Sequence, residues 1–349
     1  MWLYPLLLTT FCSFSCTSSS WENLNLPTRL LEYHIRSNID LKERCLIDSN
    51  CPIKSDLLTS SRCWGYEEDC HLNDTYAHEV ELGKCNLHTD RPIVRDAPQV
   101  FFDQGDFGYL KSRLIKNEIC ISNNSLMSSL SCSDSLLYCY ARNIFFDLSS
   151  FQVAGSARYR NDLIHEGEIG GNCEIFNSEV LNRNLDAKSY LQSWAHELKH
   201  FSSSNSFSVS QENCDIIFER PTVLMKLDAS INMYHHFCDF VNLYASLHIN
   251  NSFAQQIDVV WWDTHSEGFI DKFFGITWEA FSVKKPTELI NLAGKRVCFR
   301  DVMLPLLARQ RFGLFYNMPL TPGCSGSGLI HSFSHFILHR LQVEQTDKF

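Results

Sequence analysis

An imidazole and a carboxylate with the spacing needed for proton transfer lie in the second half of the 349-residue chain. His235 and Asp239 are four residues apart, so their side chains can touch if this stretch is helical. In the wall of an active site, Asp239 would orient His235 so that the imidazole can accept a proton. On a surface helix the same two residues would form a solvated ion pair of little energetic value. The spacing alone leaves both interpretations open.

The residues around this pair have the periodicity of an amphipathic helix. At about 100° per residue, positions 232–244 divide into an apolar stripe and a polar stripe on opposite faces. The apolar stripe consists of Met233, Phe237, Phe240, Val241 and Tyr244, and the polar stripe of Asn232, His235, Asp239 and Asn242. We therefore predict a helix over 232–244 whose polar face carries the candidate pair, with His236 between the two stripes.

A second constellation, His196-Glu197-Leu198-Lys199-His200, matches the His-Glu-x-x-His pattern of zinc peptidases. In that pattern two histidines one helical turn apart bind the metal, and the glutamate acts as the base. The apolar residues around this motif are Leu191, Trp194, Ala195, Leu198 and Phe201. If they form the buried stripe of a helix, both histidines face solvent, whereas a peptidase would bury them in its cleft. The extended continuation with a third histidine is absent, but Glu212 or Glu219 can still be a distant third ligand, so a zinc peptidase remains an alternative to our prediction of no metal site.

Two short apolar segments predict the strands that would position these residues. They are residues 215–218 (Asp-Ile-Ile-Phe) and 257–262 (Ile-Asp-Val-Val-Trp-Trp), and helical periodicity lies between them. A strand, a helix and a strand at this spacing indicate an α/β unit with a parallel sheet. We place this unit in residues 174–349, after a cysteine-rich N-terminal region at 21–173.

Fifteen cysteines indicate an oxidising compartment, because cytosolic proteins rarely contain so many. Thirteen remain if Cys12 and Cys16 leave with a signal peptide, so one thiol is free or pairs outside the chain. The pairs Cys45/Cys51, Cys63/Cys70 and Cys132/Cys139 are separated by more residues than a zinc knuckle allows. We therefore predict disulfides, whose connectivity the sequence leaves open.

The N-terminus and the charge of the chain bear on its location and partners. Residues 1–20 read as a signal peptide, because the apolar stretch from Trp2 to Leu8 runs into small polar residues. No segment has the roughly 20 uninterrupted apolar residues of a spanning helix, so we expect no membrane anchor. A formal net charge of −10 argues against binding to nucleic acid or to anionic membranes. We expect N-glycans at the sequons of Asn73, Asn123 and Asn250.

Longer motifs resemble a known family over residues 45–343. They include residues 63–67 (CWGYE), 106–109 (DFGY), 167–171 (GEIGG), 191–194 (LQSW), 225–228 (MKLD), 232–240 (NMYHHFCDF), 295–299 (KRVCF) and 312–317 (FGLFYN). In these motifs the chain resembles the EGF domain-specific O-linked N-acetylglucosamine transferases of glycosyltransferase family 61.

The resemblance implies an inverting transfer of N-acetylglucosamine from UDP-N-acetylglucosamine (UDP-GlcNAc) to Ser or Thr hydroxyls of EGF-like domains in the endoplasmic reticulum lumen. It also implies a GT-B-like fold of two Rossmann-type lobes, in which ligands bind beyond the carboxyl ends of the strands. That site would lie near Asp228 and the turn from His235 to Asp239, where one group must take the proton of the acceptor hydroxyl. The candidate catalytic residues are therefore Asp228, His235, His236 and Asp239, with their individual roles open.

The chain departs from the family pattern in three places. The family's acidic Asp-Tyr-Asp stretch is replaced by Val283-Lys284-Lys285, which leaves any divalent metal requirement open. Residues 345–349 carry no family-type retention tail, so secretion is also possible. Residues 174–349 suffice for about one domain, so we expect the second, donor-binding lobe to be largely missing. A non-catalytic lumenal binding protein is therefore a further alternative.

Overall fold

The structure is a computed structural model, and it describes residues 39–59, 84–85, 107–113, 116–151, 163–183, 190–229, 231–250, 256–263, 273–309, 324–325 and 327–343. Seven single residues are also described: Trp21, Leu31, Glu32, Ile35, Val100, Phe101 and Asp103. The predicted signal peptide at 1–20 and the sequon at Asn73 lie outside the described residues.

Short helices and strands alternate along the chain. The α-helices are α2 (Ile39–Ile47), α3 (Lys54–Thr59), α5 (Phe107–Ser112), α6 (Ser178–Arg183), α7 (Ala195–Leu198), α8 (Met233–Ile249) and α9 (Gly328–Arg340), and the 3-10 helices are η2 (Asp134–Leu136), η3 (Gly275–Ala280) and η4 (Leu289–Leu292). The strands are β1 (Lys84–Cys85), β2 (Asn117–Ile121), β3 (Ser129–Cys132), β4 (Cys139–Asp147), β5 (Ile169–Gly171), β6 (Ile175–Phe176), β7 (Phe201–Ser203), β8 (Ile216–Phe218), β9 (Thr222–Met225), β10 (Asp258–Trp261), β11 (Thr287–Glu288), β12 (Arg296–Leu304) and β13 (Cys324–Ser325). Within the described ranges, no helix combines the length and the apolar character required to cross a bilayer.

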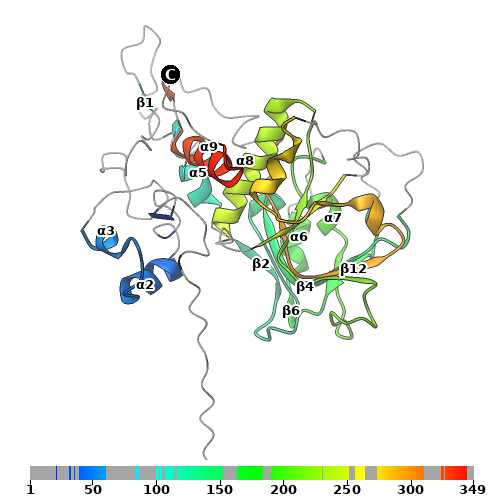
Figure 1. Cartoon of the computed structure of the whole chain (residues 1–349). Coiled ribbons are helices and arrows are strands. Elements are labelled where there is room, and N and C mark those ends of the chain that lie inside the picture. The colour runs from blue at the N-terminus through cyan, green and yellow to red at the C-terminus, as the bar shows by residue number, and fades with distance from the viewer. Residues whose placement is uncertain are drawn as a thin grey trace, which may run out of the picture.

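Most of the strands join one mixed sheet (Figure 1). Its order is β11-β10-β9-β12-β4-β3-β2-β6, with β5 and β7 branching from β4, and β8 pairing with β12. The strands β11, β10, β9 and β12 run parallel, whereas β12, β4, β3, β2 and β6 pair antiparallel in turn. The protein is therefore a mixed α/β structure, and β4 and β12 form its centre through a long antiparallel ladder.

The predicted strands and helix are present, but the parallel unit that the helix connects begins with β9, a strand that was not predicted. The strand expected at 215–218 is β8, and the one expected at 257–262 is β10. The helix between them is α8, and it connects β9 to β10, which pair in parallel from Asp258 opposite Thr222 to Trp261 opposite Met225. This crossover brings the carboxyl ends of β9 and β10 to the same edge of the sheet.

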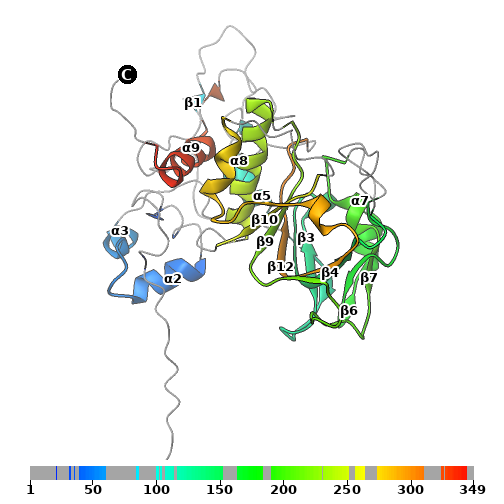
Figure 2. The same cartoon turned by 45° about the vertical axis from the view of Figure 1, so that its right-hand side comes forward.

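Each face of the sheet carries its own hydrophobic core. On one face, α5, α8, α9 and η3 pack over β9, β10 and part of β12 (Figure 2). On the other face, side chains of α6, α7 and η4 pack against β4, β5 and the opposite side of β12. Burial of these apolar surfaces is the main stabilising contribution, worth about 25 cal/mol per Å². The helix α8 is therefore fixed along its length on the face that leads to the candidate site.

Close packing explains two glycines in the 167–171 motif. A Cβ atom on Gly170 would lie 2.4 Å from the Ser202 carbonyl oxygen, and one on Gly171 would lie 2.4 Å from the Ser128 hydroxyl. Such distances are shorter than van der Waals contact, so β5 can lie between β4 and β7 only with glycine at both positions.

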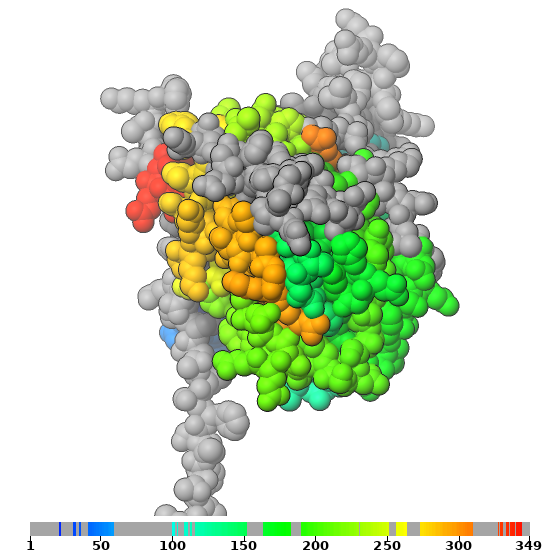
Figure 3. Space-filling model, turned by 90° about the vertical axis from the view of Figure 1, so that its right-hand side faces the viewer, coloured from blue at the N-terminus to red at the C-terminus, as the bar shows by residue number. Residues whose placement is uncertain are grey.

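Strands from both sides of the predicted division at residue 173/174 belong to the same sheet. β2, β3, β4 and β5 precede the division, and β12, which pairs with β4 over eight residue pairs, follows it. Figure 3 shows segments coloured orange, from the later part of the chain, packed directly against segments coloured green. The division does not coincide with an edge of the sheet.

Four disulfides occur among the described residues, as predicted. They join Cys45 to Cys51, Cys120 to Cys173, Cys132 to Cys139 and Cys214 to Cys298. In two of the closely spaced cysteine pairs noted in the sequence, the two cysteines therefore form a disulfide with each other. Cys238 is a free cysteine, buried in α8, and burial raises the pKa of its thiol to about 12.

Candidate active site at the carboxyl ends of β9 and β10

The amino end of α8 is fixed by a side-chain cap. The Asn232 side-chain oxygen accepts hydrogen bonds from the backbone N–H groups of Tyr234 (3.0 Å) and His235 (3.4 Å), which satisfies two of the free donors in the first turn. The helix predicted over 232–244 is thus confirmed, and it continues to Ile249. The cap places His235 in the first turn, next to the loop that follows β9.

Asp228 lies three residues after β9, and its side chain is fully buried. One carboxylate oxygen, Oδ2, is 3.0 Å from His235 Nδ1. The other, Oδ1, is 2.6 Å from an Arg309 guanidinium nitrogen. The His235 side chain is 22% exposed and that of Arg309 is 45% exposed, so both partners connect the buried carboxylate with the surface.

The structure places the Asp228 carboxylate beside His235, a contact that the sequence analysis did not predict. Asp239 accepts a hydrogen bond from the backbone N–H of Asp228 at 2.9 Å, and the carboxylate beside His235 is that of Asp228. Helical spacing permitted the predicted contact, but the loop after β9 supplies a carboxylate that reaches the imidazole from outside the helix. Asp239 therefore holds the backbone that carries the partner of His235.

The polar stripe of α8 is not a solvated face. Asp239 is 5% exposed and Asn242 is fully buried, with the Asn242 side chain donating to the Cys238 carbonyl. Ser246, one turn further, donates to the Asn242 carbonyl and accepts from the backbone N–H of Leu306. These contacts attach α8 to the segment after β12. They exclude the interpretation that 232–244 is a surface helix whose polar stripe faces solvent.

His236 points into a different environment from His235. It is buried, and its Nε2 lies 3.0 Å from the Thr277 hydroxyl of η3. Its ring also lies against the rings of Phe240 (4.8 Å between centroids) and Phe274 (5.0 Å). Of the two adjacent histidines, the structure brings only His235 to the Asp228 carboxylate.

Arg309 was missed by the sequence reasoning. It follows β12 by five residues and lies 81 positions after Asp228, so no local periodicity connects the two. The guanidinium is charged at all relevant pH values and offsets the negative charge of the buried carboxylate. A second missed residue is Asp263, which is buried two residues after β10.

Glu197, the central residue of the His-Glu-x-x-His motif, forms a buried ion pair. Lys226 Nζ lies 2.8 Å from one carboxylate oxygen and 2.9 Å from the other, and the two side chains are 0% and 2% exposed. The Trp262 indole also donates to Glu197. Lys226 Nζ lies over the rings of Tyr190 (3.8 Å) and Trp194 (4.2 Å). Burial lowers the pKa of Lys226, and the Glu197 carboxylate opposes that shift.

This ion pair leaves the motif without the geometry of a zinc peptidase. Both oxygens of Glu197 are engaged, so the carboxylate is not free to act as a base. The expected helix is also shorter than predicted: α7 contains only residues 195–198, and His200 lies in the turn after it. Burial lowers the pKa of His196 and of His200. Among the described residues, no three His, Cys, Asp or Glu side chains cluster in a way that could hold a metal ion.

Residues 282–284 lie at the opposite end of β10 from Asp263. The Ser282 hydroxyl donates to the carbonyl of Ile257, directly before β10, and Lys284 Nζ lies 3.9 Å from Asp258. Val283 is 73% exposed. In this chain, residues 282–284 therefore lie at the amino end of the strand, whereas Asp228 lies beyond the carboxyl end of the neighbouring strand.

Comparison with known proteins identifies relatives along nearly the whole chain. No protein-family model matches. EGF domain-specific O-linked N-acetylglucosamine transferases of Xenopus laevis, Bos taurus and Drosophila melanogaster are 41%, 40% and 38% identical to it over 331, 327 and 327 residues. These alignments cover 93%, 93% and 91% of the chain and 61% of each relative. The chain is therefore a homologue of the EGF domain-specific O-linked N-acetylglucosamine transferases, and it is shorter than the relatives it matches.

Proposed function

We propose that the chain is a glycosyltransferase that transfers N-acetylglucosamine from UDP-GlcNAc to Ser or Thr hydroxyls of EGF-like domains in the endoplasmic reticulum lumen. The names of its relatives and their 38–41% identity support the reaction and the acceptor. The disulfides support an oxidising compartment. The parallel β9-α8-β10 unit, with polar side chains beyond its carboxyl edge, supports assignment to one Rossmann-type lobe of a GT-B-like enzyme.

The contact between His235 and Asp228 carries the proposal. His235 Nδ1 lies 3.0 Å from the buried carboxylate, which favours the tautomer that has its proton on Nδ1 and the free lone pair on Nε2. Nε2 then takes the proton of the acceptor hydroxyl as the hydroxyl oxygen attacks the anomeric carbon of the sugar. The bond from that carbon to the diphosphate breaks, UDP leaves with the electron pair, and the configuration inverts. The imidazole afterwards releases the proton to solvent.

The other residues of the cluster position this base. Asp228 orients His235 and stabilises the imidazolium that forms, as a buried carboxylate does in other histidine-based sites. Asp239 fixes the backbone of Asp228. Arg309 offsets the carboxylate charge and presents the exposed part of its guanidinium beside the base. His236 has a structural role in this proposal, since it connects α8 with η3.

The test is a transfer assay with the purified chain, labelled UDP-GlcNAc and a folded EGF-like module. We expect His235→Gln to lower the rate by roughly 100-fold or more, because general base catalysis contributes factors of this size. Asp228→Asn should also lower the rate, since it removes the charge that stabilises the imidazolium. The matched control is His200→Gln, a partly exposed histidine outside the cluster, which should keep the rate of the parent chain.

An unchanged rate in His235→Gln would refute the assignment of the base. One alternative is a non-catalytic lumenal protein that binds EGF-like modules. Binding of the EGF module without any transfer by the parent chain would support that alternative over the enzyme. Equal loss of transfer in the His200→Gln control would show that the effect of His235→Gln is not specific to the base.

A further inference from the structure

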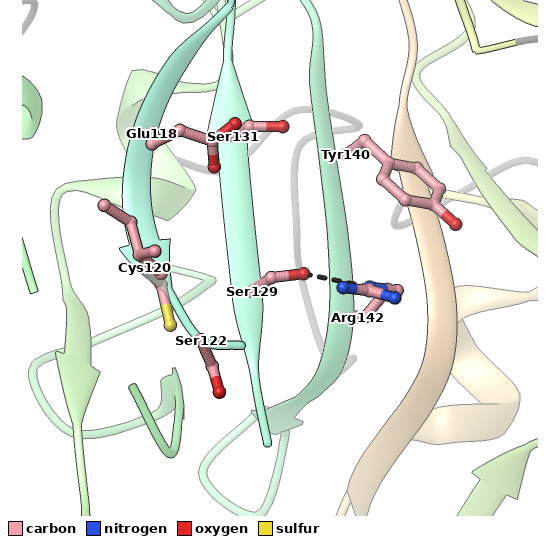
Figure 4. A pocket seen from close by; sticks show the side chains of 8 residues that line it. Glu118, Cys120, Ser122, Ser129, Ser131, Tyr140 and Arg142 are labelled. Carbon is pink, nitrogen blue, oxygen red and sulfur yellow. Dashed lines mark hydrogen bonds between the residues drawn. The ribbon is translucent and has the colours of Figure 1, made fainter. Parts of the chain in front are cut away.

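A polar pocket lies on the sheet away from the candidate active site. Its volume is about 220 Å³, and its polar lining comes from three neighbouring strands and the turn after β2 (Figure 4). The polar side chains are Glu118, Ser122, Ser129, Ser131, Tyr140 and Arg142. Neither the proposed reaction nor the comparison with relatives assigns a role to this pocket.

The register of the strands explains why polar side chains gather here. Ser131 of β3 lies opposite Glu118 of β2 and opposite Tyr140 of β4, and Ser129 of β3 lies opposite Arg142 of β4. Residues directly opposite one another in paired strands project from the same face of a sheet. Positions 129 and 131, and positions 140 and 142, are two apart, so these side chains share that face.

The pocket lies at the far end of α8 from His235. The Tyr140 hydroxyl donates to Asp301 at 2.6 Å and is within hydrogen-bonding reach of Asn250, the residue that caps the carboxyl end of α8. His235 is in the first turn of the same helix, and 17 helical residues span about 25 Å. A ligand in the pocket would therefore not occupy the proposed catalytic position.

The lining supplies both donors and acceptors. Arg142 is exposed, and its Nε donates to the Ser129 hydroxyl at 3.2 Å, which orients the guanidinium along the pocket. The remaining guanidinium nitrogens are donors, the Glu118 carboxylate is an acceptor, and each serine hydroxyl is both. Figure 4 shows Tyr140 leaning toward β12, where its ring forms a side of the polar face.

This combination fits a neutral ligand rich in hydroxyl groups. Glu118 and Arg142 are the two charged residues of the lining and carry opposite charges, so the lining has no net charge to attract an ion. An apolar ligand would displace water from the polar groups of the lining without replacing its hydrogen bonds, which is costly. A sugar ring offers adjacent hydroxyls that each donate and accept, and it has an apolar face that can lie on an aromatic ring. We propose that the pocket on β2, β3 and β4 binds a neutral saccharide.

Two sources of such a saccharide are consistent with the position of the pocket. Asn123 directly follows Ser122 of the lining, is exposed, and belongs to a sequon, so a glycan of the chain itself could fold onto the pocket. A saccharide carried by another glycoprotein has the same chemistry. The two sources differ in whether the pocket is already occupied in the glycosylated chain.

The experiment measures binding of N,N′-diacetylchitobiose, a neutral disaccharide, by saturation-transfer NMR and titration. Two starting proteins are compared, the parent chain and Asn123→Gln. Each is measured alone, with Arg142→Gln added, and with Ser131→Ala added. We expect Arg142→Gln to weaken binding by about tenfold, the effect of one lost hydrogen bond to a charged group. The matched control is Arg300→Gln, on β12, whose side chain contacts Glu219 and should not affect binding. Asp228→Asn should also leave binding unchanged, which separates this proposal from the proposed reaction.

The results test whether the pocket binds a saccharide and also show which of the two sources supplies it. Binding by both the parent chain and Asn123→Gln supports a site for an external saccharide, and binding only by Asn123→Gln supports occupancy by the chain's own glycan. In either case Ser131→Ala, which keeps the charges, should weaken binding too. Absence of binding by both proteins, or binding that neither Arg142→Gln nor Ser131→Ala weakens, would overturn the proposal.

Discussion

Asp228 is the residue on which the candidate site depends, because three other residues converge on it. His235 and Arg309 contact different oxygens of its carboxylate, and Asp239 binds its backbone. The carboxylate is fully buried, so its charge is stabilised by these specific partners and not by water. A buried carboxylate with a partly exposed imidazole beside it is suited to taking a proton from a substrate that approaches from solvent.

The two sequons that the structure describes differ in how exposed their asparagine side chains are. Asn123 is exposed in the turn between β2 and β3, whereas Asn250 is half-buried at the end of α8 and its side chain reaches Tyr140. We predict that the folded chain carries a glycan at Asn123 and that Asn123→Gln removes one glycan mass. Peptide mass spectrometry before and after treatment with a glycan-removing enzyme measures this, with Asn250→Gln as the matched control. A glycan found at Asn250 and not at Asn123 would contradict the prediction.

Among the elements, the short helix α7 and the segment directly after β9 are joined by the Lys226–Glu197 pair. The environment of Lys226 is closed by two aromatic rings and by the backbone carbonyls of Tyr190 (3.1 Å) and Ser193 (3.4 Å). Trp194 in turn donates to the carbonyl of Pro305, on the segment that leads to Arg309. The pair therefore connects β9, α7 and the segment after β12.

Removing one partner of this pair should destabilise the chain strongly. Lys226→Met leaves the Glu197 carboxylate buried without its counter-charge, which costs about 3–5 kcal/mol of unfolding free energy. Adding Glu197→Gln to Lys226→Met should restore part of that loss, because it removes the unpaired charge. Urea denaturation measures both variants. Lys199→Met, at an exposed lysine of the same segment, is the control and should change stability by less than about 0.5 kcal/mol.

A single mutant no less stable than the parent chain would show that the ion pair does not stabilise the fold. A double mutant less stable than Lys226→Met would show that the buried charge is not the cause of the loss.

The helix α8 and the strands β8 and β10 could be predicted because their signals are local. Asn232 caps the helix, its apolar residues recur every three to four positions, and the strands are continuous apolar runs. The central strand β4 was not predicted, because it lies in the cysteine-rich region at 21–173, where the sequence analysis predicted disulfides and no strands. The contacts of Asp228 could not be predicted, since they depend on how the loops after β9 and β12 meet in space. The sequence therefore predicted the helix α8, but not the contacts between its residues and the loops around it.

Over the whole molecule, disulfides connect segments that are distant in the sequence. Cys214–Cys298 closes a loop of 84 residues between the segment before β8 and the middle of β12. Cys132–Cys139 closes a loop of only 7 residues between β3 and β4. Because a cross-link removes more entropy from the unfolded chain when its loop is longer, the two bonds should differ in their effect on stability.

We expect replacement of both cysteines by serine to cost about 4 kcal/mol at Cys214–Cys298 and about 2 kcal/mol at Cys132–Cys139. Urea denaturation of the two double variants under non-reducing conditions gives the comparison, and each variant serves as the control of the other. Equal losses, or a larger loss at the shorter loop, would show that strain or packing in the folded state outweighs the loop entropy.

One helix supplies two of the three contacts to Asp228. His235 and Asp239 lie one turn apart on α8, one touching the carboxylate and the other the backbone of the same aspartate. A rotation of α8 about its axis would therefore pull on both attachments at once and in the same direction. Asp228 and the His235 imidazole would move together, so the distance and orientation between them would be kept in small displacements of the helix. The distance from either group to Arg309 would change.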